Sequence, residues 1–137
     1  MKNAVLLTLL ALSAGAWAAD PKTNFVDHST GLMIDAATAK QVMGDNIPAK
    51  VWKLYPASKY AFASQVEGGM EGTNCVITAR VMLLPLTPTM KAVLFRPQKT
   101  ATAFGTAANS STEACKTLAK DKLKEATGAV VSALVKL

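Results

Sequence analysis

Two cysteines, Cys75 and Cys115, are the feature that most constrains how this chain can fold. Each lies in a segment with a clear hydrophobic period. From Thr73 to Leu83 every second residue is apolar or small, and Cys75 belongs to this series, as in a strand buried on one face. The C-terminal segment has apolar residues at spacings of three and four, which form one helical stripe: Cys115, Ala119, Leu123, Ala126, Val130, Leu134 and Leu137. We therefore expect both cysteines to face the same core.

The first twenty residues indicate the compartment in which these cysteines lie. They have a basic start at Lys2, an apolar run from Ala4 to Leu12 and small residues around Ala18, which is the pattern of a secretory signal peptide of bacterial type. The run is shorter than the roughly 20 residues that a membrane-spanning helix needs. No cysteine lies near the cleavage point, so we do not expect a lipoprotein. We predict a signal peptide over residues 1–18, one mature domain over residues 19–137, and a periplasmic or extracellular location.

Export to an oxidising compartment predicts that Cys75 and Cys115 form a disulfide. The bond would close a loop of about forty residues, for which chain entropy gives a stabilisation of about 4 kcal/mol. A nucleophilic thiol would need a nearby histidine or a second cysteine in a CxxC pair, and the sequence around the cysteines has neither.

The other segments predict an α+β domain built on an antiparallel meander. Residues 59–66 are aromatic-rich and end at a Gly-rich turn over residues 67–72, so they would form a hairpin with the Cys75 strand. A third strand is expected over residues 91–104. It should lie at the edge of the sheet or break at Pro97, because proline cannot donate a ladder hydrogen bond.

Helices are expected before and after this sheet. Asp35 is the expected cap and Gly44 the expected stop of a short helix. A second short helix would begin with Asn46 as its cap and a proline in its first turn. Ser110 and Glu113 resemble a capping box for the C-terminal helix. The complete prediction is a three- to four-stranded β-meander, a long C-terminal helix packed on it, and one or two short N-terminal helices.

The predicted sheet is apolar on both faces over part of its length. Met82, Leu84, Leu94 and Phe104 fall opposite the Cys75 face. We expect the N-terminal helices to cover this second face; a homodimer interface and a groove for an apolar ligand are the alternatives.

The sequence offers no catalytic constellation. Asp27, His28 and Ser29 supply the residue types of a hydrolase triad, but neighbours on an extended chain point to opposite faces, so we place His28 on a surface loop. Glu67 and Glu71 flank the Gly-rich turn and are interpreted as solvated acids, not as an acid and base pair. One histidine and two paired cysteines leave too few ligands for a transition metal, and no phosphate-binding Gly loop is present. We expect neither enzyme activity nor a cofactor.

The segment Lys50–Tyr60 is the predicted partner-binding surface. Aromatic rings interleaved with ammonium groups can bind proteins, sugars or anionic polymers. The candidate residues are Lys50, Trp52, Lys53, Tyr55, Lys59 and Tyr60. The alternative is that the rings belong to the core and the lysines are solvated. A row of lysines on the C-terminal helix, Lys116, Lys120 and Lys124, is interpreted as a solvated face.

These observations favour a noncatalytic protein-interaction module, such as an inhibitor, an immunity-type protein or an envelope accessory factor. A carrier of a small apolar or amphipathic ligand between sheet and helices is the alternative. The net charge of +6 falls by one to +5 when Lys2 leaves with the signal peptide, and it favours anionic neighbours weakly. The expected partner is another envelope or secreted protein, with anionic glycans or lipid headgroups as alternatives. A homodimer is compatible with the sequence, and a nucleic acid partner is not expected.

Overall fold

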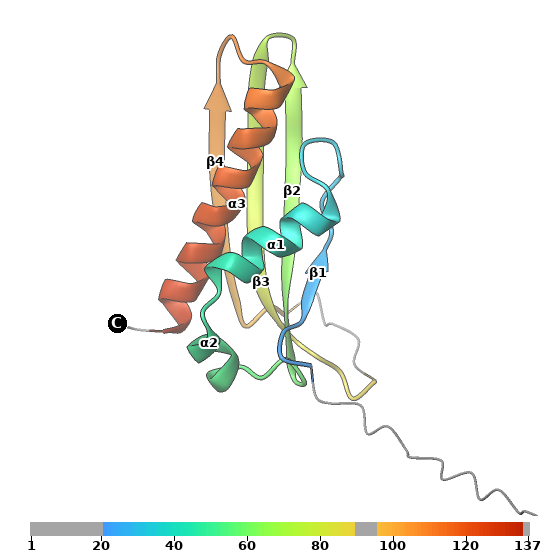
Figure 1. Cartoon of the computed structure of the whole chain (residues 1–137), viewed down its shortest axis with the longest axis vertical. Coiled ribbons are helices and arrows are strands. Elements are labelled where there is room, and N and C mark those ends of the chain that lie inside the picture. Colours follow the sequence, from blue (N-terminus) through green and yellow to red (C-terminus); the bar gives the residue numbers. More distant parts are fainter. Residues whose placement is uncertain (1–20, 90–95, 136–137) are drawn as a thin grey trace, which may run out of the picture.

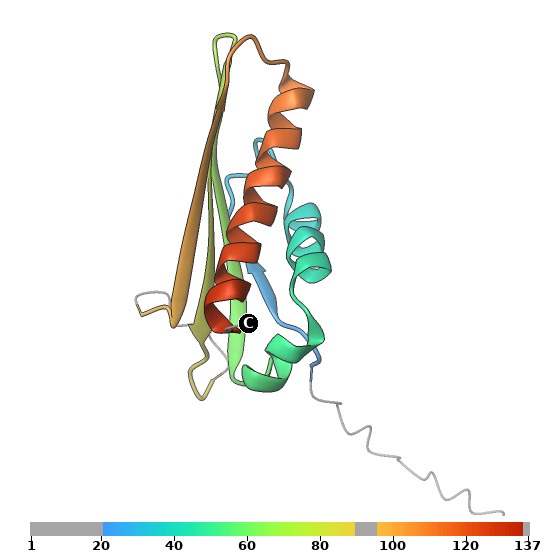
Figure 2. The same cartoon turned by 90° about the vertical axis from the view of Figure 1, so that its left-hand side faces the viewer.

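The computed structural model of the chain describes residues 21–89 and 96–135. The elements are, in chain order, β1 (Phe25–Asp27), α1 (Ala36–Asn46), α2 (Ala49–Leu54), β2 (Tyr60–Glu71), β3 (Asn74–Pro85), β4 (Lys99–Ala107) and α3 (Thr112–Leu134). The strands form one mostly antiparallel sheet in the order β1-β2-β3-β4, with helices packed on one face (Figures 1 and 2). The α+β prediction is confirmed. The predicted signal peptide, residues 1–18, lies outside the described residues.

The hairpin of β2 and β3 forms the centre of the sheet. Glu71 pairs with Asn74, so the turn consists of two residues only. The first of them, Gly72, has a φ of +62°, as the first position of a type II′ turn requires. The broader predicted turn over residues 67–72 is therefore wrong. β2 continues through Gly68 to Glu71 because the glycines there adopt positive φ values without breaking the pairing with β3.

Gly68 is a position in this hairpin where a side chain is not tolerated. Its φ is +102°, and a Cβ atom there would lie 2.1 Å from the carbonyl oxygen of Val76. We expect Gly68→Ala to lower the free energy of unfolding by about 1–3 kcal/mol, because the strain and the clash both involve backbone. Gly128→Ala in α3 is the matched control, since nothing lies within 4 Å of its Cβ position. It should raise stability by about 1 kcal/mol. Denaturant unfolding measures both changes, and a Gly68→Ala variant as stable as the wild type would contradict this account.

β4 is an edge strand, as predicted, and it begins just beyond Pro97. The Gln98 N–H donates to the carbonyl oxygen of Leu83 at 2.7 Å, and the ladder with β3 then runs from Lys99 to Ala107 with an unbroken register. Residues 91–95 of the predicted strand lie outside the described residues.

The N-terminal helices begin and end partly as predicted. Asp35 caps α1: its Oδ1 accepts the Thr38 N–H at 2.8 Å, and this hydrogen bond lowers the pKa of the Asp35 carboxyl. Gly44 does not stop the helix, because the fully buried Met43 holds the last turn in the core and α1 continues to Asn46. Asn46 does not cap α2, since its side-chain amide donates to a carbonyl oxygen of α1 at 2.7 Å. The proline at position 48 is the N-cap residue of α2 and makes no side-chain cap bond.

The long C-terminal helix is capped by Ser111, one residue after the predicted Ser110. The Ser111 hydroxyl oxygen accepts the Ala114 N–H at 3.1 Å. The Ser110 N–H donates to the carbonyl oxygen of Thr73 at 2.8 Å, which ties the start of α3 to the β2–β3 turn. The predicted apolar stripe is confirmed for the residues that are buried in α3: Cys115, Ala119, Leu123, Ala126 and Val130. Leu137, the last residue of the predicted stripe, lies outside the described residues.

The N-terminal helices do not cover the second face of the sheet, so this prediction is wrong. α1 packs beside α3 on the same face of the sheet (Figure 2). The two short helices form the crossover between the parallel strands β1 and β2, and their buried residues Met43 and Val51 join the core under α3. On the other face, Leu84 is buried, Met82 is half-buried and the Phe104 side chain is 62% exposed. The fourth residue of the predicted apolar set, at position 94, lies outside the described residues.

Candidate functional site

The two cysteines form the predicted disulfide. Cys75, near the start of β3, is joined to Cys115 in the first turn of α3, with their Cα atoms 5.5 Å apart. Both side chains are fully buried. The bond therefore fixes the long helix on the sheet and leaves neither sulfur as a thiol nucleophile.

Asp27, His28 and Ser29 do not form a triad. The Asp27 Oδ1 accepts the hydroxyls of Ser29 at 2.6 Å and of Ser64 at 2.7 Å, and the Ser29 hydroxyl oxygen accepts the Val66 N–H at 2.9 Å. His28 is exposed, as predicted, and in the described part of the chain its ring bonds to neither neighbour. The cluster is structural: it fastens the end of β1 to β2 and satisfies the fully buried Ser64 hydroxyl. The sequence signal for this buried hydroxyl was a serine between Phe62 and Val66, in the series of β2 residues that face the core.

Glu67 and Glu71 do not form a paired acid and base. Both lie on β2, four residues apart, which along a strand corresponds to about 13 Å. The Glu67 carboxylate instead accepts the side-chain amide of Gln65 at 2.6 Å.

The aromatic rings of the predicted partner-binding segment pack against other rings. Trp52, in α2, lies edge-on to Phe25 and Phe62, with ring centroids 5.6 Å and 5.2 Å away. Tyr55 packs in the same manner on Tyr60, at 5.3 Å. Trp52 is half-buried, so its ring supports the core and also reaches the surface. The lysines of the segment, Lys50, Lys53 and Lys59, are all exposed around these rings. Binding by this segment stays a prediction.

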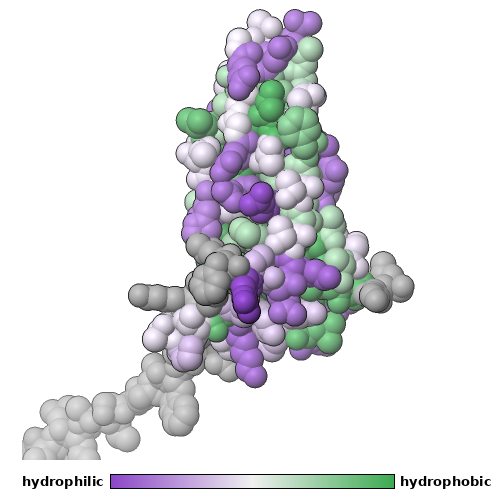
Figure 3. Space-filling view, turned by 180° about the vertical axis from the view of Figure 1, so that it is seen from behind, coloured by the Kyte–Doolittle hydropathy of each residue, from purple (hydrophilic) through white to green (hydrophobic). Residues whose placement is uncertain are grey.

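The side of the sheet that faces away from α3 is the face on which the sequence placed Met82, Leu84 and Phe104, and for which a homodimer interface and a groove for an apolar ligand were the alternatives to coverage by helices. We call it the open face, because none of the described helices or strands lies over it. At the end near Tyr60 this side of the sheet is buried, at Ala61, Ala63 and Leu84. The open face consists of the outward side chains of β2, β3 and β4 that are at least partly exposed: Gln65, Glu67, Val76, Thr78, Arg80, Met82, Thr100, Thr102, Phe104 and Thr106. Figure 3 shows this side of the molecule, where hydrophobic and hydrophilic residues are interspersed.

Arg80 lies at the centre of the open face. The sheet register places it opposite Gln65 on one side and Thr102 on the other. His28, Gln65, Arg80 and Met82 line a shallow depression of about 360 Å³. Arg80 is exposed, and in the described part of the chain its guanidinium has no ion-pair partner. The five N–H donors of the guanidinium can therefore bind a carboxylate or a carbonyl group of a partner.

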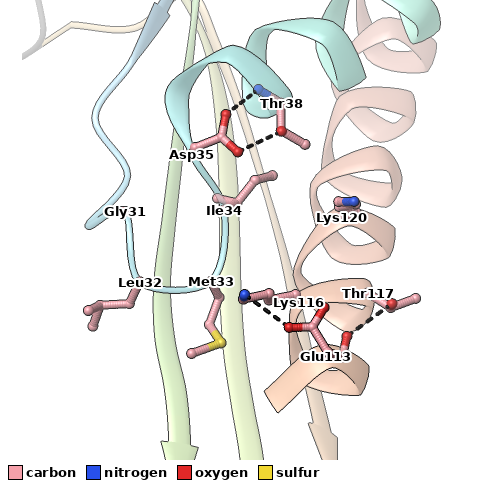
Figure 4. Close-up of a pocket in the computed structure, with 10 residues that line it drawn as sticks. All are labelled: Gly31, Leu32, Met33, Ile34, Asp35, Thr38, Glu113, Lys116, Thr117 and Lys120. Carbon is pink, nitrogen blue, oxygen red and sulfur yellow. Dashed lines mark hydrogen bonds and ion pairs between the residues drawn. The ribbon is translucent and has the colours of Figure 1, made fainter. Parts of the chain in front are cut away.

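A second depression, of about 260 Å³, separates the loop before α1 from the N-terminal half of α3 (Figure 4). Its charged groups are largely engaged: Asp35 caps α1, and Lys116 pairs with Glu113 at 3.1 Å. Lys120 has no ion pair among the described residues, and Leu32 on the loop is 67% exposed. The groove is open to solvent, with Lys120 on the α3 side and Leu32 on the loop side (Figure 4).

The comparisons with known proteins give a general likeness of backbone only. No protein-family model and no curated protein matches the chain. A dodecamer of a PelC variant from Paraburkholderia phytofirmans is 13% identical, with 82% of this chain and 93% of the other covered at a TM-score of 0.49. A second PelC dodecamer from that organism is 14% identical, with 82% and 92% covered at a TM-score of 0.44. A protein from Caulobacter crescentus CB15 is 10% identical, with 80% and 83% covered at a TM-score of 0.37.

Two further observations concern the chemistry available to the described residues. Within residues 21–89 and 96–135, no three His, Cys, Asp or Glu side chains lie close enough together to hold a metal ion. No helix in the same ranges combines the length and the apolar character needed to cross a membrane.

Proposed function

We propose that this protein is an exported, noncatalytic interaction module that binds another envelope or secreted protein through the open face of its sheet. The signal-peptide pattern of residues 1–18 and the buried disulfide both suit an oxidising compartment. The observation that carries the proposal is the asymmetry of the sheet. The described helices all pack on one face, whereas the other presents an exposed Arg80 and Phe104 to solvent.

The chemistry of the open face suits a protein partner. Phe104 is 62% exposed and lies in the row next to that of Arg80, and arginine and aromatic side chains are enriched among residues that dominate binding energy. Both residues lie on strands of a continuous sheet, so their backbone positions are fixed before binding. Such preorganisation lowers the entropic cost of association.

The two other function classes have less support in the geometry. A hydrolase would need His28 beside an acid and a nucleophile, but Asp27 and Ser29 are bonded to each other and to β2. A ligand carrier would need a closed apolar cavity between sheet and helices. The depressions around Arg80 and Lys120 are instead open and lined by polar and apolar groups together.

Arg80→Glu tests the proposed surface. The oxidised mature protein is immobilised and used for quantitative capture from an extract of the cells that produce it, and proteins retained by the wild type are identified. We expect Arg80→Glu to weaken retention of a specific partner at least about 30-fold, which corresponds to about 2 kcal/mol for a central interface arginine.

Lys124→Glu is the matched control, because it makes the same change of charge at an exposed position on α3, on the far side of the molecule. It should leave retention unchanged. Equal loss in both variants would indicate general electrostatic attraction, and equal retention would exclude Arg80 from the interface; either result contradicts the proposal.

A further inference from the structure

The outer edge of β4 is unpaired in the described structure. β4 is the last strand in the order β1-β2-β3-β4, and Figure 1 shows it at one side of the sheet. Its register with β3 has no bulge, it contains no proline, and Thr100 to Ala107 carry no charge. Proteins usually protect exposed sheet edges by charges, prolines, bulges or short strands, since an unprotected edge pairs readily with another strand. β4 has none of these protections between Thr100 and Ala107.

The opposite edge of the sheet is protected. β1 has three residues only, and the chain after it stays hydrogen-bonded to β2. The His28 N–H donates to the carbonyl oxygen of Ser64 at 2.8 Å, and the Thr30 N–H donates to that of Val66 at 3.2 Å. This contrast makes the exposure of the nine-residue β4 a specific feature of one edge.

We propose that β4 pairs antiparallel with β4 of a second copy of this chain, across a two-fold axis, so that two four-stranded sheets become one continuous sheet. In such a pair, each β4 strand runs antiparallel to the identical strand of the other copy. Centred on Ala103, it sets Thr102 opposite Phe104, Thr100 opposite Thr106, and Lys99 opposite the uncharged Ala107. No like charges then face each other, and the threonine and aromatic pairs favour the sheet.

A second observation favours a folded copy of the chain over an isolated peptide strand. The C-terminal turns of α3 extend past β4 in Figure 1. These turns carry Val131 and Leu134, and Val135 follows as the C-cap residue; all three are only half-buried against the core. A two-fold axis perpendicular to the sheet keeps the helices of both copies on the same face, so a second copy would bury these apolar side chains further. A lone strand would leave them as they are.

The test measures the assembly of the oxidised mature chain and of a variant with two lysines on β4. Sedimentation velocity of the wild type over about 1–100 µM should show conversion from monomer to dimer, the range in which modest interfaces associate. Thr102→Lys combined with Phe104→Lys should weaken dimerisation by about 100-fold or more, because lysines would face lysines across the axis. Both residues are exposed, and circular dichroism and thermal unfolding check that the variant remains folded.

Ala37→Lys combined with Gln41→Lys is the control, since it adds the same charge at exposed positions on α1 and should dimerise as the wild type does.

Hydrogen exchange of the unmodified wild type provides a measurement without any variant: amides of β4 should become protected as concentration rises. A wild type that stays monomeric, or β4 amides whose exchange is independent of concentration, would overturn the proposal and leave the edge to a strand from another protein. A variant with Thr102→Lys and Phe104→Lys that dimerises as strongly as the wild type would overturn the proposal as well. Because Arg80 lies on β3 and not on the β4 edge, failure here leaves the capture result with Arg80→Glu unaffected.

Discussion

Replacing Cys75 and Cys115 together by serine is expected to lower the free energy of unfolding by more than about 4 kcal/mol, of which about 4 kcal/mol arises because the disulfide closes a loop of 40 residues in the unfolded chain. That is a large part of the total stability of a domain of this size. Both sulfurs are buried, so the serine hydroxyls add a desolvation cost to the lost constraint. Denaturant unfolding of the oxidised wild type and of the variant gives the difference directly.

The Cys75→Ala and Cys115→Ala double variant separates the two contributions to this loss. It removes the cross-link without burying hydroxyl groups, so it should be more stable than the serine variant and less stable than the oxidised wild type. Reduction of the wild type should produce a loss similar to that of the alanine variant. If the reduced and oxidised wild-type proteins unfold at the same denaturant concentration, the disulfide does not stabilise the fold.

Trp52→Ala is expected to lower the free energy of unfolding by about 3 kcal/mol. The indole ring packs edge-on against Phe25 and Phe62, and its removal leaves a space beside the fully buried Phe62. The expected loss is at the lower end of the range for a large aromatic side chain in a core, since Trp52 is half-buried. Thermal or denaturant unfolding measures it.

Trp52→Phe is the control for this prediction, because it keeps an aromatic ring between Phe25 and Phe62 and should recover more than half of the lost stability. The predicted binding role of the segment is tested separately with Lys53→Glu and Lys59→Glu, whose side chains are exposed. These variants should fold as the wild type does. If they also retain a captured partner fully, the segment has a structural role only; if Trp52→Ala unfolds at the wild-type denaturant concentration, the ring does not support the core.

The elements that could be predicted from the sequence are those with a local signal. The alternation around Cys75 and the stripe that includes Cys115 each occur within one continuous segment, and both place a cysteine in the core regardless of how the rest of the chain folds. The disulfide followed from these two periods together with the signal-peptide pattern. Pro97 likewise excluded a central position for the strand after it, because the missing N–H is a property of the residue itself.

The helix boundaries were less predictable because residues of similar chemistry compete for them. Ser110 and Ser111 can each cap a helix: Ser111 caps α3, whereas the Ser110 N–H bonds to the carbonyl oxygen of Thr73, a partner 37 residues away that no local pattern indicates. Gly44 has a weak preference for a helix end, and the burial of Met43 outweighs it.

The sequence placed Met82 and Phe104 on the second face of the sheet, but the candidate binding surface around Arg80 was decided by tertiary structure. The depression around Arg80 joins His28, Gln65 and Arg80 from three separate strands or strand ends, and no local period relates these positions. That no described helix lies over this face depends on where α1 packs, and α1 joins α3 because the crossover from β1 to β2 buries its apolar residues in the same core. The sequence by itself thus determined which residues of β3 and α3 turn inward, since side-chain direction follows the local backbone period. Tertiary contacts decided on which face of the sheet the described helices pack, because this depends on packing between segments far apart in the chain.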